Sequence, residues 1–496
     1  MHRVRLQPNF RFIARYTGEN YAKKNPHPSR EGFKPHALTQ KREFVPFVAA
    51  GVAVVVGMTA MKYFARAAAR MKEEQELGNI ESELEKDDMA VLGLDLGSTY
   101  SKISYWKHGG DDGKESEVSV LENKEGRRAV ASAIMWETTE AEPKVGHLAR
   151  AARFHKPDSV VYAPILLFGA KYATDTQRSK VLGALPFDTA AHEEGQEVSV
   201  ALGKESTMMR ARSLIRTLAE DIHRTAVEKV GGDVPVVLSV PNFYPPEAHD
   251  ALLEALRGSG LTAVGVLPDS VCSIIGAFKT GKMKARDLAV AGGAITAVVV
   301  DIGGRLTQLS LMHIEGTDKN DLGVQVTSLS ERTLFEVGGD FVDDAIVSHI
   351  AEEFERDHGV DLLADGQAKQ RLYDAAETLK QDLTKTKMAS VNVPFVTATT
   401  KGPLHLDKHV TKAALDSMME KQTAALKEGL TALLFEDSKV AKAPLTTILL
   451  AGAGSRMSFV KSLAKDVSGG VDTVTVREPE SLPAIGAAAA VLHFEK

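Results

Sequence analysis

The sequence contains very little cysteine. Its single thiol, Cys272, excludes an intramolecular disulfide and a metal site built from cysteines, and its apolar surroundings indicate a buried residue. The fifteen histidines lack the spacing of metal ligands, so we expect no histidine metal site. A basic surplus is also missing, because the formal net charge of the 496 residues is −6, which argues against a nucleic-acid partner. The hydrophobic fraction of 44% is that of an ordinary globular chain.

The charge that is present is unevenly distributed, and residues 1–43 form a basic segment. Up to Gly18 there is no acidic residue, and arginines are mixed with Phe10, Phe12 and Tyr16. This pattern is typical of a mitochondrial targeting segment, although serine is scarce in it. A solvated basic tail is the alternative interpretation.

Residues 44–61 form an apolar run without a charged side chain. As a helix, about 18 residues span roughly 27 Å, close to the hydrocarbon thickness of a bilayer. We therefore predict a single transmembrane helix, with a signal-peptide core or a buried soluble helix as the alternatives. A stripe of small residues along it suggests close packing against a helix of another membrane-protein subunit: Ala49, Ala53 and Gly57.

Residues 62–88 continue in a helical pattern, basic first and then acidic, which we interpret as a juxtamembrane helix and linker. Lys and Arg are more abundant before the span than in the mixed-charge segment after it. This asymmetry favours the mitochondrial inner membrane, with the N-terminus in the matrix and the folded domain outside it. The endoplasmic reticulum membrane, with the span as a signal anchor, is the alternative.

The remaining residues, 89–496, are organised around two similar motifs. The first predicts a buried strand ending at Asp95, followed by a tight turn of small residues at Gly97, Ser98 and Thr99. Such a turn lets backbone N–H groups approach a phosphate, and Asp95 can hold a hydrated divalent cation. The pattern recurs about two hundred residues later, at Asp301, Gly303 and Gly304. Two such units indicate two similar lobes that offer hairpins to one nucleotide.

Strands and helices alternate along this region, which indicates an α/β fold. The clearest helical patterns cover residues 207–230, 246–256, much of 352–387 and 482–494. The clearest core strands are residues 236–240, 309–314 and 447–450.

The motifs resemble those of the ATPase domain of the heat-shock protein 70 (DnaK-type) family, which has an actin-like fold with two lobes. Besides the two phosphate turns, the resemblance rests on residues 240–244, 337–341, 452–456 and 478–488, all in the family's order. It implies a site for ATP or ADP, with Asp95 and Asp301 holding Mg²⁺ through water. The nucleotide contacts that it implies are Asp95, Gly97, Ser98, Thr99, Asp301, Gly303, Gly304, Gly338, Gly339, Glu377, Lys380, Gly452, Arg456 and Glu480.

The chain departs from the family pattern mainly around the γ-phosphate. The position of the family's catalytic lysine falls on Ile165, which can neither donate to phosphate nor stabilise transition-state charge. Lys171 replaces it only if the register of this segment is shifted. In the second turn, Arg305, Leu306 and Gln308 replace a glycine, a threonine and an aspartate of the family, and the acidic residue of the connecting segment becomes Asp269. The resemblance thus implies that nucleotide binds weakly or not at all and that hydrolysis is lost.

The favoured function is a membrane-anchored, non-hydrolysing relative of the chaperone ATPase domain, which acts as a structural or assembly subunit of an organellar membrane complex. The family's peptide-binding β-sandwich is not expected after Lys496. An active ATPase chaperone, or a co-chaperone that promotes nucleotide exchange on a partner chaperone, is the alternative.

Overall fold

The computed structural model describes residues 90–107, 117–138, 141–190, 196–203, 207–232, 234–400, 402–437, 441 and 443–490. The predicted targeting segment, membrane span and juxtamembrane linker, residues 1–43, 44–61 and 62–88, lie outside these residues and stay predictions. Within the described ranges, no helix has both the length and the apolar character needed to cross a bilayer.

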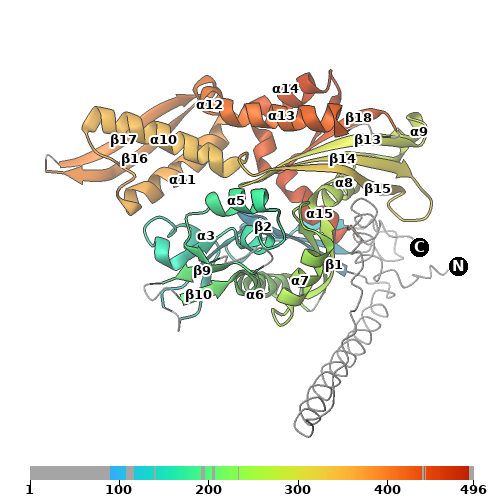
Figure 1. Ribbon diagram of the computed structural model, residues 1–496, viewed down its shortest axis with the longest axis horizontal. Coiled ribbons are helices and arrows are strands. Elements are labelled where there is room, and N and C mark those ends of the chain that lie inside the picture. Colours follow the sequence, from blue (N-terminus) through green and yellow to red (C-terminus); the bar gives the residue numbers. More distant parts are fainter. Residues whose placement is uncertain are drawn as a thin grey trace, which may run out of the picture.

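Two sheets of matching topology form the two lobes (Figure 1). The sheet of lobe I has the order β12-β11-β1-β2-β3, with strands Thr262–Pro268, Pro235–Val240, Ala90–Asp95, Tyr100–Lys107 and Glu117–Val120. The sheet of lobe II has the order β19-β18-β13-β14-β15, with strands Asp472–Thr475, Leu445–Ala451, Ala294–Ile302, Thr307–Gly316 and Val324–Leu334. In both, an antiparallel hairpin lies beside two parallel strands, which is the duplication that the sequence motifs predict.

The register of the two hairpins is also the same. Asp95 on β1 is paired with Lys102 on β2, and Asp301 on β13 is paired with Gln308 on β14. In each lobe the aspartate therefore stands opposite the residue seven positions further along the chain. Side chains of directly opposed residues lie on one face of a sheet. The predicted strand–Asp–turn–strand units are thus confirmed in both lobes.

Lobe I is completed by helices packed on its sheet and by two small sheets. The helices are α3 (His147–Arg150), α4 (Pro164–Gly169), α5 (Asp175–Gly183), α6 (Ala211–Val230) and α7 (Pro246–Leu256). The small sheets contain β5 (Ala133–Met135), β6 (Lys144–Val145) and β7 (Val160–Tyr162), and β8 (Thr189–Ala190), β9 (Ser199–Leu202) and β10 (Thr207–Arg210); the short β4 (Val130–Ala131) pairs with β2.

The helix predicted for residues 207–230 begins four residues later than expected. Residues 207–210 form β10, which pairs antiparallel with β9, and α6 starts at Ala211. Its apolar face, which includes Leu214, Leu218 and Ile222, is fully buried in the core of lobe I. Gly231 ends the helix in a left-handed conformation, as the Gly-Gly signal predicts.

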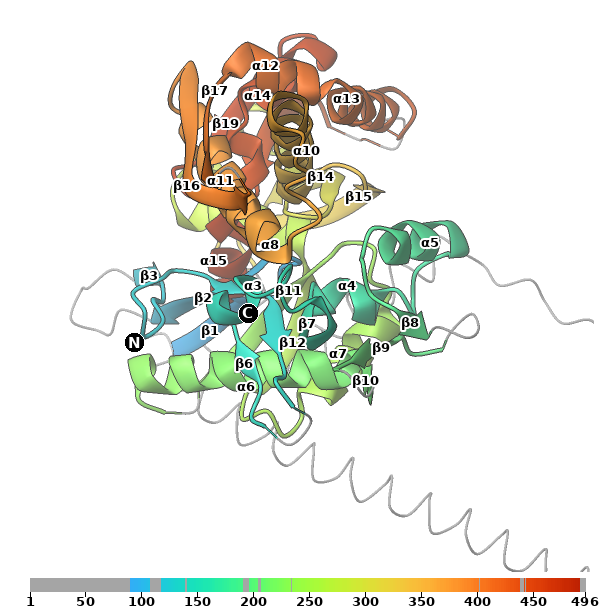
Figure 2. The same ribbon diagram turned by 90° about the vertical axis from the view of Figure 1, so that its left-hand side faces the viewer.

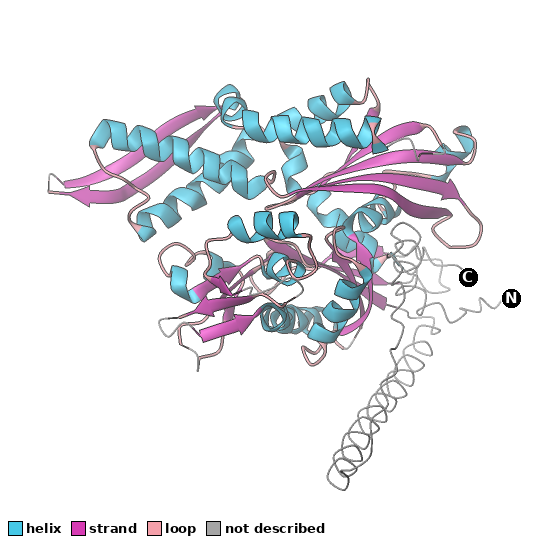
Figure 3. Cartoon of the chain, in the orientation of Figure 1, coloured by secondary structure: helices cyan, strands magenta, loops and turns pink. Residues whose placement is uncertain are grey.

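Lobe II carries its helices on the outside of its sheet and projects a long hairpin away from it (Figure 3). The helices are α9 (Ala285–Val290), α10 (Gly339–His358), α11 (Gly366–Leu383), α12 (Lys412–Met418), α13 (Glu420–Phe435) and α14 (Ser458–Val467), and the hairpin is β16 (Met388–Thr399) with β17 (Gly402–Thr411). The strand predicted at residues 447–450 is confirmed within β18.

Helices α8 (Asp269–Lys279) and α15 (Leu482–Ala488) cross between the lobes (Figure 2). They touch backbone to backbone, because a Cβ atom built on Gly486 would lie 1.7 Å from the carbonyl oxygen of Cys272. Cys272 is fully buried there, as its apolar surroundings predict. The predicted closing helix is confirmed as far as Ala488, and residues 491–496 lie outside the described part of the chain.

Candidate functional site

Three aspartates meet where the two sheets and α8 converge. Asp95 ends β1, Asp301 lies near the end of β13, and Asp269 begins α8. Burial raises the pKa of Asp95 well above its ordinary value, and the nearby Asp269 and Asp301 raise it further against the opposing charge of Lys102. Burial and then Asp269 raise the pKa of Asp301 to about 7. The sequence prediction correctly places Asp95 and Asp301 together. It missed Lys102, although the hairpin register puts this cation opposite Asp95.

Hydrogen bonds from both lobes hold Asp269. Ser239 donates to its Oδ1 at 2.6 Å, and Gln308 Nε2 donates to its Oδ2 at 2.7 Å. Gln308 Oε1 in turn accepts the backbone N–H of Asn242, which follows β11. Asn242 also donates from Nδ2 to Ser310 Oγ at 2.7 Å. Gln308, which stands at the family's aspartate position, therefore links lobe II to lobe I. Its hydrogen bond also holds the Asp269 carboxylate in place.

The two predicted phosphate turns contact each other directly. A Cβ atom built on Gly304 would lie 1.8 Å from Thr99 Oγ1, and one built on Gly338 would lie 2.4 Å from the carbonyl oxygen of Gly304. The backbone N–H of Arg305 donates to Ser98 Oγ at 3.3 Å. A phosphate oxygen bonded by both turns needs about 3 Å to a donor on each side. Since Thr99 and Gly304 are already in contact, the turns would have to separate for such a phosphate to bind.

Arg305 crosses the cleft from lobe II to lobe I. Its Nη1 donates to the carbonyl oxygen of Ala184 at 2.8 Å, and its guanidinium lies over the ring of Tyr162 at 5.1 Å. Its Nε forms an ion pair with Asp340 Oδ2 at 3.1 Å, and its side chain is only 11% exposed. Arg305 is not among the described residues with positive φ, so the turn tolerates a side chain where the family has glycine.

Asp340, the second residue of α10, is the anion at the centre of the cleft. Thr99 Oγ1 donates to its carboxylate at 3.1 Å. Burial would raise its pKa, but the cations Arg305, Arg150 and Lys380 outweigh burial and lower the pKa overall. Asp340 therefore places a negative charge beside both phosphate turns.

The residues expected to bind adenosine are engaged with protein partners in two separate groups. Glu377 on α11 accepts the Tyr100 hydroxyl at 2.8 Å and pairs with Arg150 at 3.2 Å. Lys380 donates to Asp343 at 2.7 Å and to the carbonyl oxygen of Gly339 at 2.9 Å. Arg456 pairs with Glu480 at 2.7 Å, beside the loop in which Gly452 packs against Asp301.

The two candidate positions for the missing lysine, Ile165 and Lys171, have contacts of their own. Ile165 is 1% exposed in the core of lobe I, and its carbonyl oxygen accepts the Tyr244 hydroxyl. Lys171 follows α4, and its ammonium lies over the ring of Tyr172 at 5.2 Å. The contact described for the Lys171 ammonium is thus with its neighbour in the chain, Tyr172.

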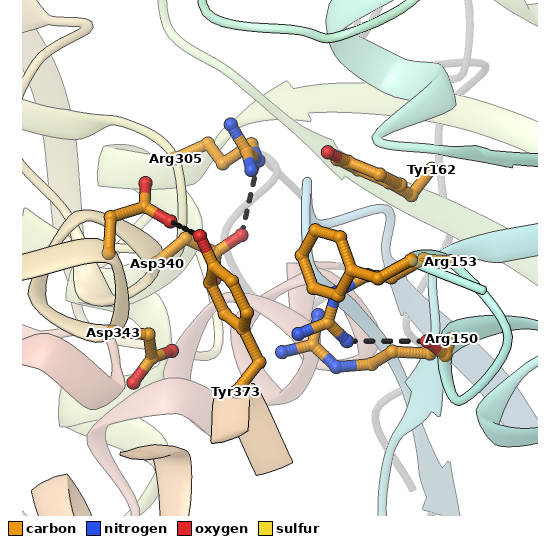
Figure 4. A pocket seen from close by; sticks show the side chains of 9 residues that line it. Arg150, Arg153, Tyr162, Arg305, Asp340, Asp343 and Tyr373 are labelled. Atoms are coloured by element: carbon orange, nitrogen blue, oxygen red, sulfur yellow. Dashed lines mark hydrogen bonds and ion pairs between the residues drawn. The ribbon is translucent and has the colours of Figure 1, made fainter. Parts of the chain in front are cut away.

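A pocket lies at the mouth of the cleft, where the lobes face each other (Figure 4). Lobe I contributes Arg150, Arg153 and Tyr162 to its wall, and α10 and α11 of lobe II contribute Asp343 and Tyr373. Arg305 of the second phosphate turn and Asp340 of the motif at residues 337–341 also line it. The sequence prediction missed this pocket, because its lining residues are far apart in the chain and meet only in the folded protein.

Two like lobes, each with an aspartate and a Gly-containing turn facing a common cleft, define a protein of the actin-like ATPase class. The family model described as "Hsp70 protein" matches residues 91–494, so the chain belongs to the Hsp70 family. It is similar to the "Chaperone protein DnaK" of Stenotrophomonas maltophilia (strain R551-3), with 29% identity over 399 residues. That match covers 80% of this chain and 58% of the relative, so the chain spans little more than half the relative's length.

Hsp70 ATPase domains normally bind ATP or ADP with Mg²⁺. Here, Asp95 and Asp301 keep the carboxylates that suit a hydrated cation. The phosphate part of a nucleotide does not fit this arrangement. Gly304 lies in contact with Thr99 of the other turn, and Asp340 adds negative charge beside both. Among the described residues, no three acidic, histidine or cysteine side chains form a direct metal-binding group.

Proposed function

We propose that this chain is a non-hydrolysing Hsp70-type domain that acts as a structural or assembly subunit. The proposal rests on the contacts that the residues of the second phosphate turn make. Arg305 donates to Ala184 of lobe I, Leu306 is buried in the core of lobe I, and Gln308 binds Asn242 and Asp269. Each of these three departures thus places a contact between the lobes where the family has a nucleotide contact.

Loss of hydrolysis is also supported by the chemistry of the site. Removing one preorganised charge or donor from a transition-state site costs about 10²–10³ in rate. With Ile165, Leu306 and Gln308, three such groups are changed together, and Lys171 supplies no replacement. Binding of nucleotide is expected to be weak, with ADP at least as good as ATP, because the turns must first separate.

A turnover assay on the full chain in mild detergent tests the proposal. We expect phosphate release from ATP at background, unchanged by Asp95→Ala or Lys171→Ala. Hydrolysis that either substitution abolishes would mean that the site is active, and would favour the alternative of a working ATPase or a co-chaperone for a partner chaperone.

We further propose that the chain is anchored by residues 44–61 in the mitochondrial inner membrane, with the folded domain outside the matrix. The proposal rests on the basic segment and apolar run of the sequence alone. Protease treatment of mitoplasts should digest the domain beyond Met89. Protection of the domain contradicts this orientation, and recovery of the protein with endoplasmic reticulum membranes supports the alternative location.

A further inference from the structure

Three polar residues stand in a row across the sheet of lobe I. Asp95 on β1 is in register with Ser239 on β11 and with Lys102 on β2. Residues in register on adjacent strands direct their side chains to the same face of a sheet. Ser239 donates to Asp269 at 2.6 Å, so this face is the one turned toward the aspartates of the cleft. Lys102, half-buried at the other end of the row, therefore faces them as well.

The hairpin of lobe II shows how far a side chain at the position of Lys102 can reach. Asp301 on β13 is in register with Gln308 on β14, and Gln308 Nε2 donates to Asp269 at 2.7 Å. Lys102 and Gln308 hold equivalent positions, because each follows the aspartate of its hairpin by seven residues. The neutral amide of lobe II thus has a charged counterpart in lobe I, directed at the same group of aspartates.

We call Asp95, Asp269 and Asp301 the aspartate cluster. Burial and Asp269 raise the pKa of Asp95 and that of Asp301, and the positive charge of Lys102 lowers both. The two side chains that donate to Asp269 are neutral. Among the residues that the structure describes, Lys102 is the cation that acts on the cluster, and it does so without a direct ion pair. Its charge therefore acts through space, as that of a cation held through water does.

We propose that Lys102 takes the place of the divalent cation at the aspartate cluster, so that the protein's own ammonium balances the carboxylates and Mg²⁺ is excluded. The inference rests on the proposed function, because a domain that transfers no phosphate does not require a metal ion for that step. A hydrated Mg²⁺ beside Asp95 would lie close to the Lys102 ammonium, and like charges repel strongly in a buried site. Lys102 is thus a residue that sets the specificity of the cluster against divalent cations.

Thermal unfolding of the full chain in mild detergent tests the proposal. Nucleotide is left out, the buffer is mildly alkaline so that the carboxylates are ionised, and MgCl₂ is compared with NaCl at equal ionic strength. The melting temperature of the wild type should not respond to Mg²⁺. Lys102→Met leaves the carboxylates unbalanced, so it should melt about 2 °C or more below the wild type in NaCl, and Mg²⁺ should restore most of this loss.

Lys107→Met is the matched control. Lys107 lies on the same strand as Lys102, but it is exposed and stands opposite Ala90 instead of an aspartate. This variant should melt without any response to Mg²⁺, like the wild type. A response to Mg²⁺ of equal size in both variants would show that the effect is not specific to the aspartate cluster, and would overturn the proposal.

Binding of Mn²⁺, followed by the loss of its EPR signal, gives a second readout that does not depend on stability. Mn²⁺ is suitable because it takes the same oxygen ligands as Mg²⁺. Lys102→Met should bind Mn²⁺ above the level of the wild type, and Lys102→Met/Asp95→Asn should return to that level, which places the ion at the cluster. No gain of binding by Lys102→Met, or an ion on the wild type that Asp95→Asn releases, overturns the proposal.

The double variant also decides the matter if Lys102→Met does not fold. It removes one charge of each sign, so recovery of the folded state supports the charge balance, and failure to recover overturns it. ATP is absent from every one of these measurements. A failure here is therefore distinct from a failure of the proposed function, which the turnover assay reports.

Discussion

Thr99 in lobe I donates a hydrogen bond to Asp340 in lobe II at 3.1 Å, although the two residues are 241 positions apart in the chain. The hydroxyl of the first phosphate turn is therefore directed at a carboxylate of the protein. Asp340 is held in its ionised form by the cations around it, Arg305 first among them. The anion in the cleft is thus Asp340 and the bridging cation is Arg305. Both belong to the protein, and their contacts join the two lobes.

Arg305→Ala should destabilise the fold strongly. Breaking a largely buried charge pair costs about 3–5 kcal/mol, and the 11% exposure of this side chain places it near that class. The matched control is Arg332→Ala, which removes an ion pair of the same lobe whose arginine is 35% exposed, for a loss of about 1 kcal/mol or less. Denaturant unfolding measures both. Equal losses in the two variants would show that Arg305 does not fasten the lobes.

Gln308→Leu should destabilise the protein by about 1–3 kcal/mol, because it leaves the buried Asp269 with Ser239 as its remaining described donor. A double-mutant cycle with Asp269→Asn isolates the contact, since residues of one hydrogen-bond network are coupled by about 0.5–3 kcal/mol. The cycle is measured by chemical unfolding at neutral pH. Strictly additive effects would argue against the inter-lobe bond.

His249 should make the protein sensitive to acid. It is buried on α7 with neither ring nitrogen bonded, and burial lowers its pKa to about 4. The unfolded chain takes up a proton near the ordinary pKa of 6.5, whereas the folded chain does so only near 4. Stability is therefore full above pH 6.5 and is lost as the pH falls toward 4, by roughly 3 kcal/mol in total.

His249→Leu should flatten this dependence, as measured by melting temperature at a series of pH values. His409→Leu, on the exposed hairpin strand β17, is the control and should retain the slope of the wild type. A slope unchanged by His249→Leu would assign the acid sensitivity to other groups.

Ala53→Leu tests the predicted contact between the membrane span and another subunit. A bulky side chain in the stripe of small residues should loosen the complex in mild detergent and leave membrane insertion intact. Native gel electrophoresis of solubilised membranes reports the result. Migration identical to the wild type would mean that the stripe is ordinary composition.

The sequence predicts the hairpins well because their signals are local. The strand before Asp95, the turn at Gly97 and their repeat at Asp301 and Gly303 each lie within about twelve residues. Buried strands and tight turns are specified at that range by apolar runs and glycine. The helix–strand boundary at Ala211 is predicted less well, because residues 207–210 pair with β9 and this tertiary pairing overrides a helical pattern.

The closure of the cleft could not be predicted, since it depends on side chains that meet only in the folded chain. The sequence shows that Arg305 replaces a glycine, but its position alone is compatible with an arginine that binds a phosphate. The ion pair with Asp340 and the bond to Ala184 decide the matter, and these partners are 35 and 121 residues away. Lys102 was missed for the same kind of reason, because only the strand register places it opposite Asp95.

The crossing of α8 and α15 makes the reactivity of Cys272 a measure of how often these two helices separate. Cys272 is the single thiol of the chain, and Gly486 presses on its backbone. Burial also raises its pKa, so that the reactive thiolate is suppressed as well as shielded. An alkylating reagent can therefore reach the thiol only when α15 has moved away from α8. The rate of alkylation then reports how often α15 separates from α8, without any label having to be introduced.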